Sequence, residues 1–141
     1  MPLIVIDVVR GHDETYLTSL LDGIHEAVVD AFEVPDTDRY QVLTQHEPFE
    51  LRALDTGLGL TRSRDLTFIR VISKTRPESA KRRLYELIAQ RLHSRLGLSG
   101  EDIIVTIVEN TGADWSFGRG TAQFLTGELP EAPIPPGDNR R

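Results

Sequence analysis

The sequence contains no cysteine, which excludes disulfide bonds, thiol nucleophiles and thiolate metal sites. It also lacks long hydrophobic runs, because the longest are about four residues and a membrane-spanning helix needs roughly 20. The start of the chain shows no basic leader with an apolar stretch and a small-residue cleavage site. We therefore predict a soluble, cytoplasmic protein with no membrane partner.

The length of 141 residues is that of one ordinary domain, which can bury a sufficient core without metal or disulfide support. We predict a single domain over residues 1–126. Residues 127–141 carry four of the eight prolines and are predicted to form an extended or disordered tail.

Charge is unevenly distributed along the chain, although the net charge is only −6. Residues 1–51 contain eleven acidic and two basic side chains, whereas residues 52–95 contain eleven basic and four acidic ones. A basic segment can serve an anion or a nucleic acid, but aromatic stacking residues do not interleave with the helical cluster Lys81, Arg82 and Arg83 as single-strand binding requires. We favour packing of an acidic half against a basic half and predict no nucleic-acid partner. The basic side chains concerned include Arg62, Arg64, Arg70, Lys74, Arg76, Lys81, Arg82, Arg83, Arg91 and Arg95.

Hydrophobic patterning predicts a β-α-β unit over residues 2–46. Residues 2–9 are apolar and β-branched, which is typical of a strand covered on both faces. From about Asp13, apolar residues recur every three or four positions, which indicates a helix with one buried stripe. Asp13 or His12 is the candidate N-cap of this helix. Pro35 ends this helix, and a second strand begins at Tyr40.

The same plan recurs 64 positions later, over residues 66–109. The shift places four pairs of identical residues in register: Glu14 and Glu78, Leu20 and Leu84, Ile24 and Ile88, Asp38 and Asp102. The predicted elements of this second unit are a strand over residues 66–73, a helix from Pro77 to Leu96 and a strand over residues 102–108.

Two such units predict an α/β (α+β) fold, with a four-stranded, mainly parallel sheet and two helices on one of its faces. The uncovered face then requires another subunit, so we expect an oligomer. The joining segment, residues 47–65, contains Gly57 and Gly59 but neither follows a strand nor opens a helix, so it is not a dinucleotide fingerprint. Residues 114–127 are predicted to form a tight C-terminal hairpin, with Gly118 and Gly120 in the turn.

Pro2 is the first candidate for chemistry. An initiator methionine followed by a small residue is normally removed, which would leave Pro2 as a free secondary amine. When protonated, this amine can donate a hydrogen bond to a carbonyl oxygen, and when neutral it can take a proton or add to a carbonyl. Alternatively, Pro2 only protects the terminus or starts a strand.

A proline heading a duplicated β-α-β chain resembles the tautomerase superfamily, and the details resemble its malonate semialdehyde decarboxylases. The resemblance covers nearly the whole chain except the proline-rich tail, and it implies a homotrimer that needs no cofactor or metal. The stretches that carry it are MPLIVIDV, VPDTDRYQ, TQHEP, LDTGLGLTRS, VISKTRPE and VENTGADWSFGRGTAQFLTGEL.

The resemblance implies that Pro2, Asp38 and Arg76 are catalytic. It implies that Lys74 and Arg76 bind the substrate carboxylate, with lysine standing where the family has arginine and thus lacking the bidentate fork. Trp115 and Phe117 carry over to an apolar wall around the substrate. The residues themselves agree in kind: positions 74 and 76 are two apart on an extended stretch, so we expect both to project to one side, before a helix N-terminus. Asp38 alone could equally be a turn or cap residue, and the two aromatics could be core or interface anchors.

The resemblance implies decarboxylation of a small 3-oxo acid, and we expect protonated Pro2, its pKa kept high by Asp38, to polarise the carbonyl oxygen. A Schiff base on Pro2 is the competing mechanism. One alternative is a tautomerase, hydratase or dehalogenase of small unsaturated or 2-oxo acids. Another is a non-catalytic trimeric binding protein. The four histidines lack metal-ligand spacing, and His25 is predicted to be a packed structural residue of the first helix.

Overall fold

Two β-α-β units follow one another along the chain in the computed structural model, which describes residues 1–130. Both ends of the second helix lie 64 residues after those of the first, which confirms the predicted repeat. Three short 3₁₀ turns occupy Pro48–Glu50, Gly100–Asp102 and Gly112–Asp114. The strands and helices are β1 (Leu3–Val9), α1 (Glu14–Phe32), β2 (Tyr40–His46), β3 (Thr67–Lys74), α2 (Glu78–Leu96), β4 (Ile103–Asn110) and α3 (Gln123–Thr126).

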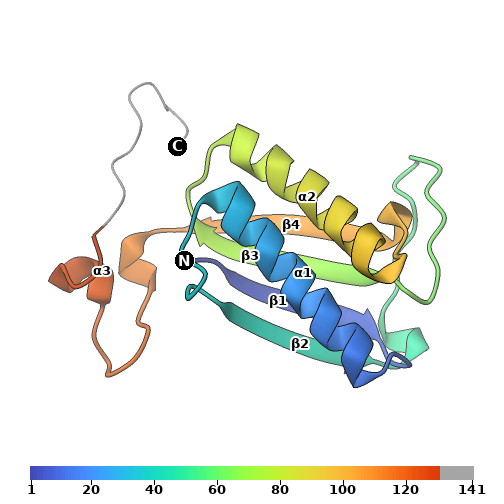
Figure 1. Ribbon diagram of the computed structural model, residues 1–141, viewed down its shortest axis with the longest axis horizontal. Coiled ribbons are helices and arrows are strands. Elements are labelled where there is room, and N and C mark those ends of the chain that lie inside the picture. Colours follow the sequence, from blue (N-terminus) through green and yellow to red (C-terminus); the bar gives the residue numbers. More distant parts are fainter. Residues whose placement is uncertain (131–141) are drawn as a thin grey trace.

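The four strands form one sheet in the order β2-β1-β3-β4, with α1 and α2 side by side on one face (Figure 1). Within each unit the two strands are parallel, as predicted, but the units meet through an antiparallel pairing of β1 with β3. Because of this junction, the starts of β1 and β2 lie at the same end of the sheet as the ends of β3 and β4. That end also carries the N-terminus (Figure 1).

The core lies between the helices and the sheet. The central residues of both predicted stripes are at most 1% exposed, whereas Leu17 and Leu21 of α1 are only partly buried. The stripes pack on the alternate strand residues that face them. Asp13 is the N-cap of α1, since its Oδ1 accepts a hydrogen bond of 2.8 Å from the Tyr16 amide. The core residues that define the stripes and the sheet floor are Leu20, Ile24, Val28, Leu84, Ile88, Leu92, Ile4, Ile6, Val8, Ile69 and Val71.

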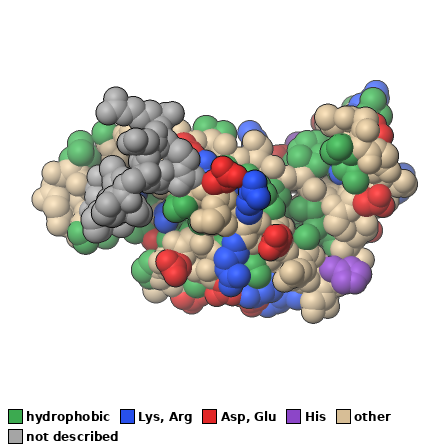
Figure 2. Space-filling model, turned by 90° about the horizontal axis from the view of Figure 1, so that it is seen from above, with side chains coloured by type: hydrophobic (Ala, Val, Ile, Leu, Met, Phe, Trp, Pro, Cys, Tyr) green, Lys and Arg blue, Asp and Glu red, His purple; other side chains and the backbone are tan. Residues whose placement is uncertain are grey.

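The face of the sheet away from the helices stays open in the single chain. Val42 of β2 and Val108 of β4 are 51% and 54% exposed there, so β1 has helix cover on one face and not on both. Phe49, Leu54 and Leu58 of the joining segment are also exposed. Hydrophobic side chains lie close together at the right-hand end of Figure 2, which is the end where Figure 1 shows the joining segment. An apolar surface of this kind calls for a partner.

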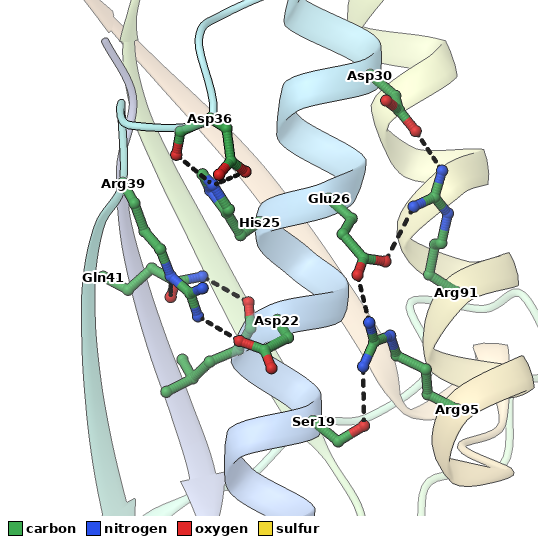
Figure 3. A network of polar contacts seen from close by, with 11 residues as sticks. Ser19, Asp22, His25, Glu26, Asp30, Asp36, Arg39, Gln41, Arg91 and Arg95 are labelled. Carbon is green, nitrogen blue, oxygen red and sulfur yellow. Dashed lines mark hydrogen bonds and ion pairs between the residues drawn. The ribbon is translucent and has the colours of Figure 1, made fainter.

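Complementary charges join the two helices, as the uneven charge distribution predicts. Arg91 of α2 donates to Glu26 (3.0 Å) and to Asp30 of α1, and Arg95 donates to Glu26 and to Ser19 (Figure 3). Other members of the basic segment also have acidic partners: Lys81 pairs with Glu109 and Arg82 with Glu78. Within residues 1–130, no helix is both long and apolar enough to span a membrane.

The segment after β4 forms the predicted tight turn, closed by a bridge between Gly118 and Thr121, but it continues as the short helix α3 and not as a second strand. The Gln123 side chain accepts from the Phe117 amide (3.0 Å) and donates to the Gly118 carbonyl and the Thr121 hydroxyl (2.9 Å each). These bonds satisfy polar groups that a second strand would otherwise pair. Most of the predicted tail, residues 131–141, lies outside the described residues.

Candidate active site

The predicted site residues come from three strand ends that the antiparallel junction brings to one end of the sheet. Pro2 directly precedes β1, and Leu3 pairs with Tyr40 of β2 on one side and with Ile72 of β3 on the other. Asp38 therefore lies just before β2, and Lys74 ends β3. Asp38 and Lys74, which follow Pro2 by 36 and 72 positions in the sequence, thus lie near the N-terminus in the fold.

A buried carboxylate faces the N-terminal amine. Asp38 is only 7% exposed, and its Oδ2 lies 3.9 Å from the Met1 nitrogen. Within the described part of the chain, this oxygen accepts no hydrogen bond although it is fully buried. A buried acceptor without a donor is costly, so the fold does not use Asp38 to stabilise itself in the ordinary way.

Arg76 is held beside the same amine by the end of α1. Its Nε donates to Ser73 Oγ and its Nη1 to the Phe32 carbonyl, both at 3.2 Å, and its guanidinium lies 4.9 Å from the Phe32 ring centre. Burial lowers the pKa of Arg76 and Asp38 raises it, but the group stays charged. A guanidinium has five N–H donors, and these two contacts leave others for an anion.

The amine itself is strongly affected by this environment. The pKa of the Met1 amine is lowered from 8.0 to about 6. Burial contributes most to this shift, followed by the charge of Arg76, and Lys74 also lowers the pKa, while Asp38 raises it. The convergence of these charges on one nitrogen makes this end of the sheet the candidate reactive site.

Lys74 and Arg76 approach the site from different sides. We expected both to project to one side of an extended stretch, but β3 ends at Lys74 and the alternation does not continue to Arg76. Arg76 packs on Phe32 of α1, whereas the Lys74 ammonium lies 3.9 Å from the ring centre of Phe124. The two charges can therefore hold two different groups of a small ligand, or one carboxylate between them.

Trp115 and Phe117 stack on each other, with ring centres 5.3 Å apart and planes 9° apart. Phe117 also contacts Tyr40 at 5.5 Å and Phe124 at 5.7 Å, so a four-ring wall links the start of β2 to Lys74. The Trp115 Nε1 donates to Asn110 Oδ1 (2.8 Å), which anchors the wall to the end of β4.

Sequence reasoning missed Tyr40 and Phe124 as members of this wall. Tyr40 was predicted only as the start of a strand, and Phe124 lies in a stretch without periodicity. The one available signal was the density of aromatic residues between positions 115 and 124, in a chain with only 6% aromatic residues.

Comparison with known proteins identifies close relatives. The tautomerase enzyme family matches residues 38–118, and a second family of the same description matches residues 2–56. YrdN, a probable tautomerase of Bacillus subtilis strain 168, is 50% identical over 129 residues, which cover 92% of this chain and 100% of YrdN.

Solved structures agree with this family match. A malonate semialdehyde decarboxylase, solved in wild-type, mutant and inactivated forms to explain its decarboxylase and hydratase activities, is 48% identical with a TM-score of 0.88, over 90% of this chain and 98% of that one. A second one, FG41 malonate semialdehyde decarboxylase inhibited by 3-bromopropiolate, is 37% identical with a TM-score of 0.88, over 92% and 99% of the two chains.

A more distant structure, a fused 4-OT solved as a symmetric trimer, shares the fold at 20% identity, with a TM-score of 0.72 over 89% of this chain and 98% of that one. The first family match alone spans more than half of the chain, and YrdN aligns over nearly all of it. The fold and the sequence thus agree, and the chain belongs to the tautomerase family.

Proposed function

We propose that this protein is a decarboxylase of a small 3-oxo acid, with malonate semialdehyde as the first substrate to test and acetaldehyde and carbon dioxide as products. The observation that carries the proposal is the buried Asp38 carboxylate, which lies beside the N-terminal amine and whose Oδ2 has no hydrogen-bond donor among residues 1–130. The identity of 48% to a malonate semialdehyde decarboxylase supports the choice of substrate.

The proposal requires that Met1 is removed, which makes Pro2 the amine-bearing residue. Pro2 is already buried at the head of β1, and the residue before it is the amine that Asp38 and Arg76 now act on. In this site a secondary ammonium donates a hydrogen bond to the substrate carbonyl oxygen and keeps Asp38 as its counter-ion.

The two cations provide the binding part of the mechanism. Arg76 and Lys74 hold the substrate carboxylate while the bond between that carboxylate and C2 breaks, and its electron pair moves into the polarised carbonyl as an enol. C2 then takes up a proton, which releases the aldehyde. In this mechanism the substrate carbonyl is the electron sink, and the Pro2 ammonium makes it a better one by donating its hydrogen bond to the oxygen.

Binding of the substrate also changes the electrostatics of the amine. In the free site burial lowers the pKa of the Met1 amine most, the charges of Arg76 and Lys74 lower it as well, and Asp38 raises it. A bound carboxylate offsets the charge of Arg76, so the balance moves toward the protonated amine when substrate is present. This reconciles a lowered pKa in the free protein with an acid role for Pro2 in the complex.

The assembly that we propose is a homotrimer, as in the fused 4-OT that shares the fold. The open sheet face and the exposed Phe49, Leu54 and Leu58 supply the apolar surface that such an assembly would bury. Light scattering after gel filtration tests it, with three times the chain mass of 15.8 kDa as the expected value. A particle of the mass of one chain would contradict the trimer.

The direct test follows acetaldehyde and carbon dioxide release from malonate semialdehyde. Wild type is compared with Pro2→Ala and Arg76→Ala, and Arg82→Ala is the control, because Arg82 lies on the outer surface of α2 with its side chain 75% exposed. We expect both site variants to lose at least about 100-fold in rate, and the control to retain full activity. Equal rates in all four proteins would favour the non-catalytic binding protein.

One observation favours a second activity. The environment that lowers the pKa of the Met1 amine to about 6, through burial first and then the charge of Arg76, also favours the neutral form of a Pro2 amine. A neutral Pro2 is a base that can move the proton of an enol, as in a tautomerase. Ketonisation of the enol of phenylpyruvate tests this activity. Borohydride trapping with malonate semialdehyde separates both routes from a Schiff base, which alone adds mass to the N-terminal peptide.

A further inference from the structure

The loop that carries Asp38 is fastened to α1 by side chains of that helix. Residues 33–39 connect α1 to β2, and His25 of α1, only 6% exposed, reaches across to this loop. Its Nε2 lies 2.8 Å from the Asp36 carbonyl oxygen and 3.1 Å from Asp36 Oδ1 (Figure 3). Next to this contact, the Asp38 amide donates to the Pro35 carbonyl at 2.9 Å, which closes a tight turn.

A second fastening lies on the other side of Asp38. Arg39 donates to Asp22 Oδ1 of α1 and to Gln41 Oε1, both at 2.8 Å, and the Gln41 amide donates to the Leu21 carbonyl at 2.7 Å. Asp22 and His25 are three residues apart and so lie on one face of the helix, toward the loop (Figure 3). Glu26 and Asp30 leave the same helix toward α2.

The backbone between these two fastenings determines where the Asp38 carboxylate lies. Its Oδ2 accepts no hydrogen bond from residues 1–130, so the distance of 3.9 Å to the N-terminal nitrogen depends on the position of the loop. Displacements of about 1 Å at a reacting centre are enough to lower rates strongly.

The second unit has no such fastening. The positions that correspond to His25, Asp36 and Arg39 hold Ala89, Gly100 and Ile103, none of which has a polar side chain. There the equivalent aspartate, Asp102, is held directly by Ser63. The two contacts to α1 thus occur in the unit whose aspartate has an oxygen, Asp38 Oδ2, without a hydrogen-bond donor among residues 1–130.

We infer that His25 and Asp22 are positioning residues, which hold the 36–39 loop so that Asp38 stays against the amine that carries the proposed reaction. This inference rests on the proposed function and adds two residues that contact neither the amine nor Arg76. It assigns a specific task to a histidine that the sequence alone predicts only to be packed.

The test titrates the N-terminal amine by nitrogen NMR in wild type, His25→Leu and His25→Gln, after mass spectrometry has identified the first residue. Asp38 raises the pKa of the amine, so a displaced carboxylate in His25→Leu lowers that pKa by about one unit. Glutamine carries an amide donor for the Asp36 carbonyl and restores most of the wild-type value. His93→Leu is the matched control, since His93 is an exposed histidine of α2.

Kinetics with malonate semialdehyde provide the second readout. We expect kcat of His25→Leu to fall about tenfold with KM nearly unchanged, because Arg76 still binds the carboxylate, and His25→Gln to recover most of the loss. If His25→Leu does not fold, Asp22→Leu breaks the other fastening and is measured instead, with Asp22→Asn as its conservative variant.

The outcomes separate the two proposals. An unchanged amine pKa and an unchanged kcat in a folded His25→Leu or Asp22→Leu protein would overturn the positioning role. If the wild type shows no decarboxylase activity but His25→Leu still has a lower amine pKa than wild type, the positioning role is supported while the proposed function fails.

Discussion

The two β-α-β units have an aspartate at the same position, just before their second strand, but the two carboxylates differ in their hydrogen-bond donors. Asp102 of the second unit is 3% exposed and accepts from the Ser63 amide (2.6 Å) and the Ser63 hydroxyl (2.5 Å) through its two oxygens. Asp38 of the first unit is buried to a similar degree, yet its Oδ2 has no donor within residues 1–130. One copy therefore stabilises the fold, and the other is available for chemistry.

The opposite ends of the sheet differ in the same way. The positions that correspond to Pro2 and Arg76 hold Leu66 and His12 in the other copy. Leu66 is buried within the chain and cannot supply a terminal amine, and His12 pairs with Asp65 at 3.0 Å and stacks on Tyr16 at 3.7 Å. Because a chain has one N-terminus, only one of the two related ends can carry this reaction.

The largest expected effect compares the two aspartates in catalysis. Asp38→Asn removes the counter-ion of the amine, and we expect it to lower the decarboxylation rate of malonate semialdehyde about 100-fold. Asp102→Asn should keep a rate close to wild type, because Asp102 belongs to the other end of the sheet. Equal losses in the two variants, measured as kcat/KM, would break the comparison.

Stability should show the reverse order. Asp102→Ala leaves the Ser63 amide without its acceptor, and we expect the free energy of unfolding to fall by about 2 kcal/mol. Asp38→Ala removes a carboxylate that lacks a full set of partners, and we expect a much smaller change. Denaturant titration of both variants gives the two values, and a greater loss for Asp38→Ala would refute the assignment.

The contact between the units should have a smaller effect. Arg91→Met removes the pairs that α2 makes with Glu26 and Asp30 of α1, and we expect a loss of about 1 kcal/mol that shrinks at high salt. The matched control is Arg82→Met, because Arg82 pairs with Glu78 of the same helix and both side chains are largely exposed. Urea unfolding at low and high salt measures both, and equal losses would show that the network between the helices adds no stability.

The effect with the least influence near neutral pH concerns Tyr16, at the end of the sheet that lacks the amine. Burial, then Asp65 and Asp102, raise the pKa of Tyr16 from 10.0 to about 12. Between these two values the unfolded chain loses this proton and the folded chain keeps it, so stability decreases as the pH rises from 10 to 12. Ultraviolet titration should show one late tyrosine, and Tyr16→Phe should abolish it; a wild type whose three tyrosines titrate together near pH 10 would contradict this.

Much of the fold was predictable because its signals are local. The apolar stripes of α1 and α2 follow the helical period, Pro35 and Pro77 mark helix boundaries, and the 64-residue repeat locates each element in both units. The charge segregation correctly predicted that the helices attract each other. The continuation of residues 114–127 as α3 was not predictable, because it depends on the side-chain bonds of Gln123.

The site residues could be named from the sequence, but their contacts could not be predicted from it. Pro2, Asp38, Lys74 and Arg76 were named from the sequence and its family resemblance, and the antiparallel pairing of β1 with β3 brings their chain positions to one end of the sheet. The different approaches of Lys74 and Arg76, and the ring contacts of Tyr40 and Phe124, depend on contacts between distant segments. A pattern along the chain carries no information on such contacts.

The sequence by itself thus determined the elements, their duplication and the residue types available for chemistry, because periodicity and turn residues act over a few positions. Tertiary structure alone decided which of two equivalent aspartates is free to react. Ser63 reaches Asp102 across 39 positions, whereas the N-terminal amine and the loop fastened by His25 surround Asp38. The physical reason is burial: both carboxylates leave water, but only one of them finds its full set of donors in the fold.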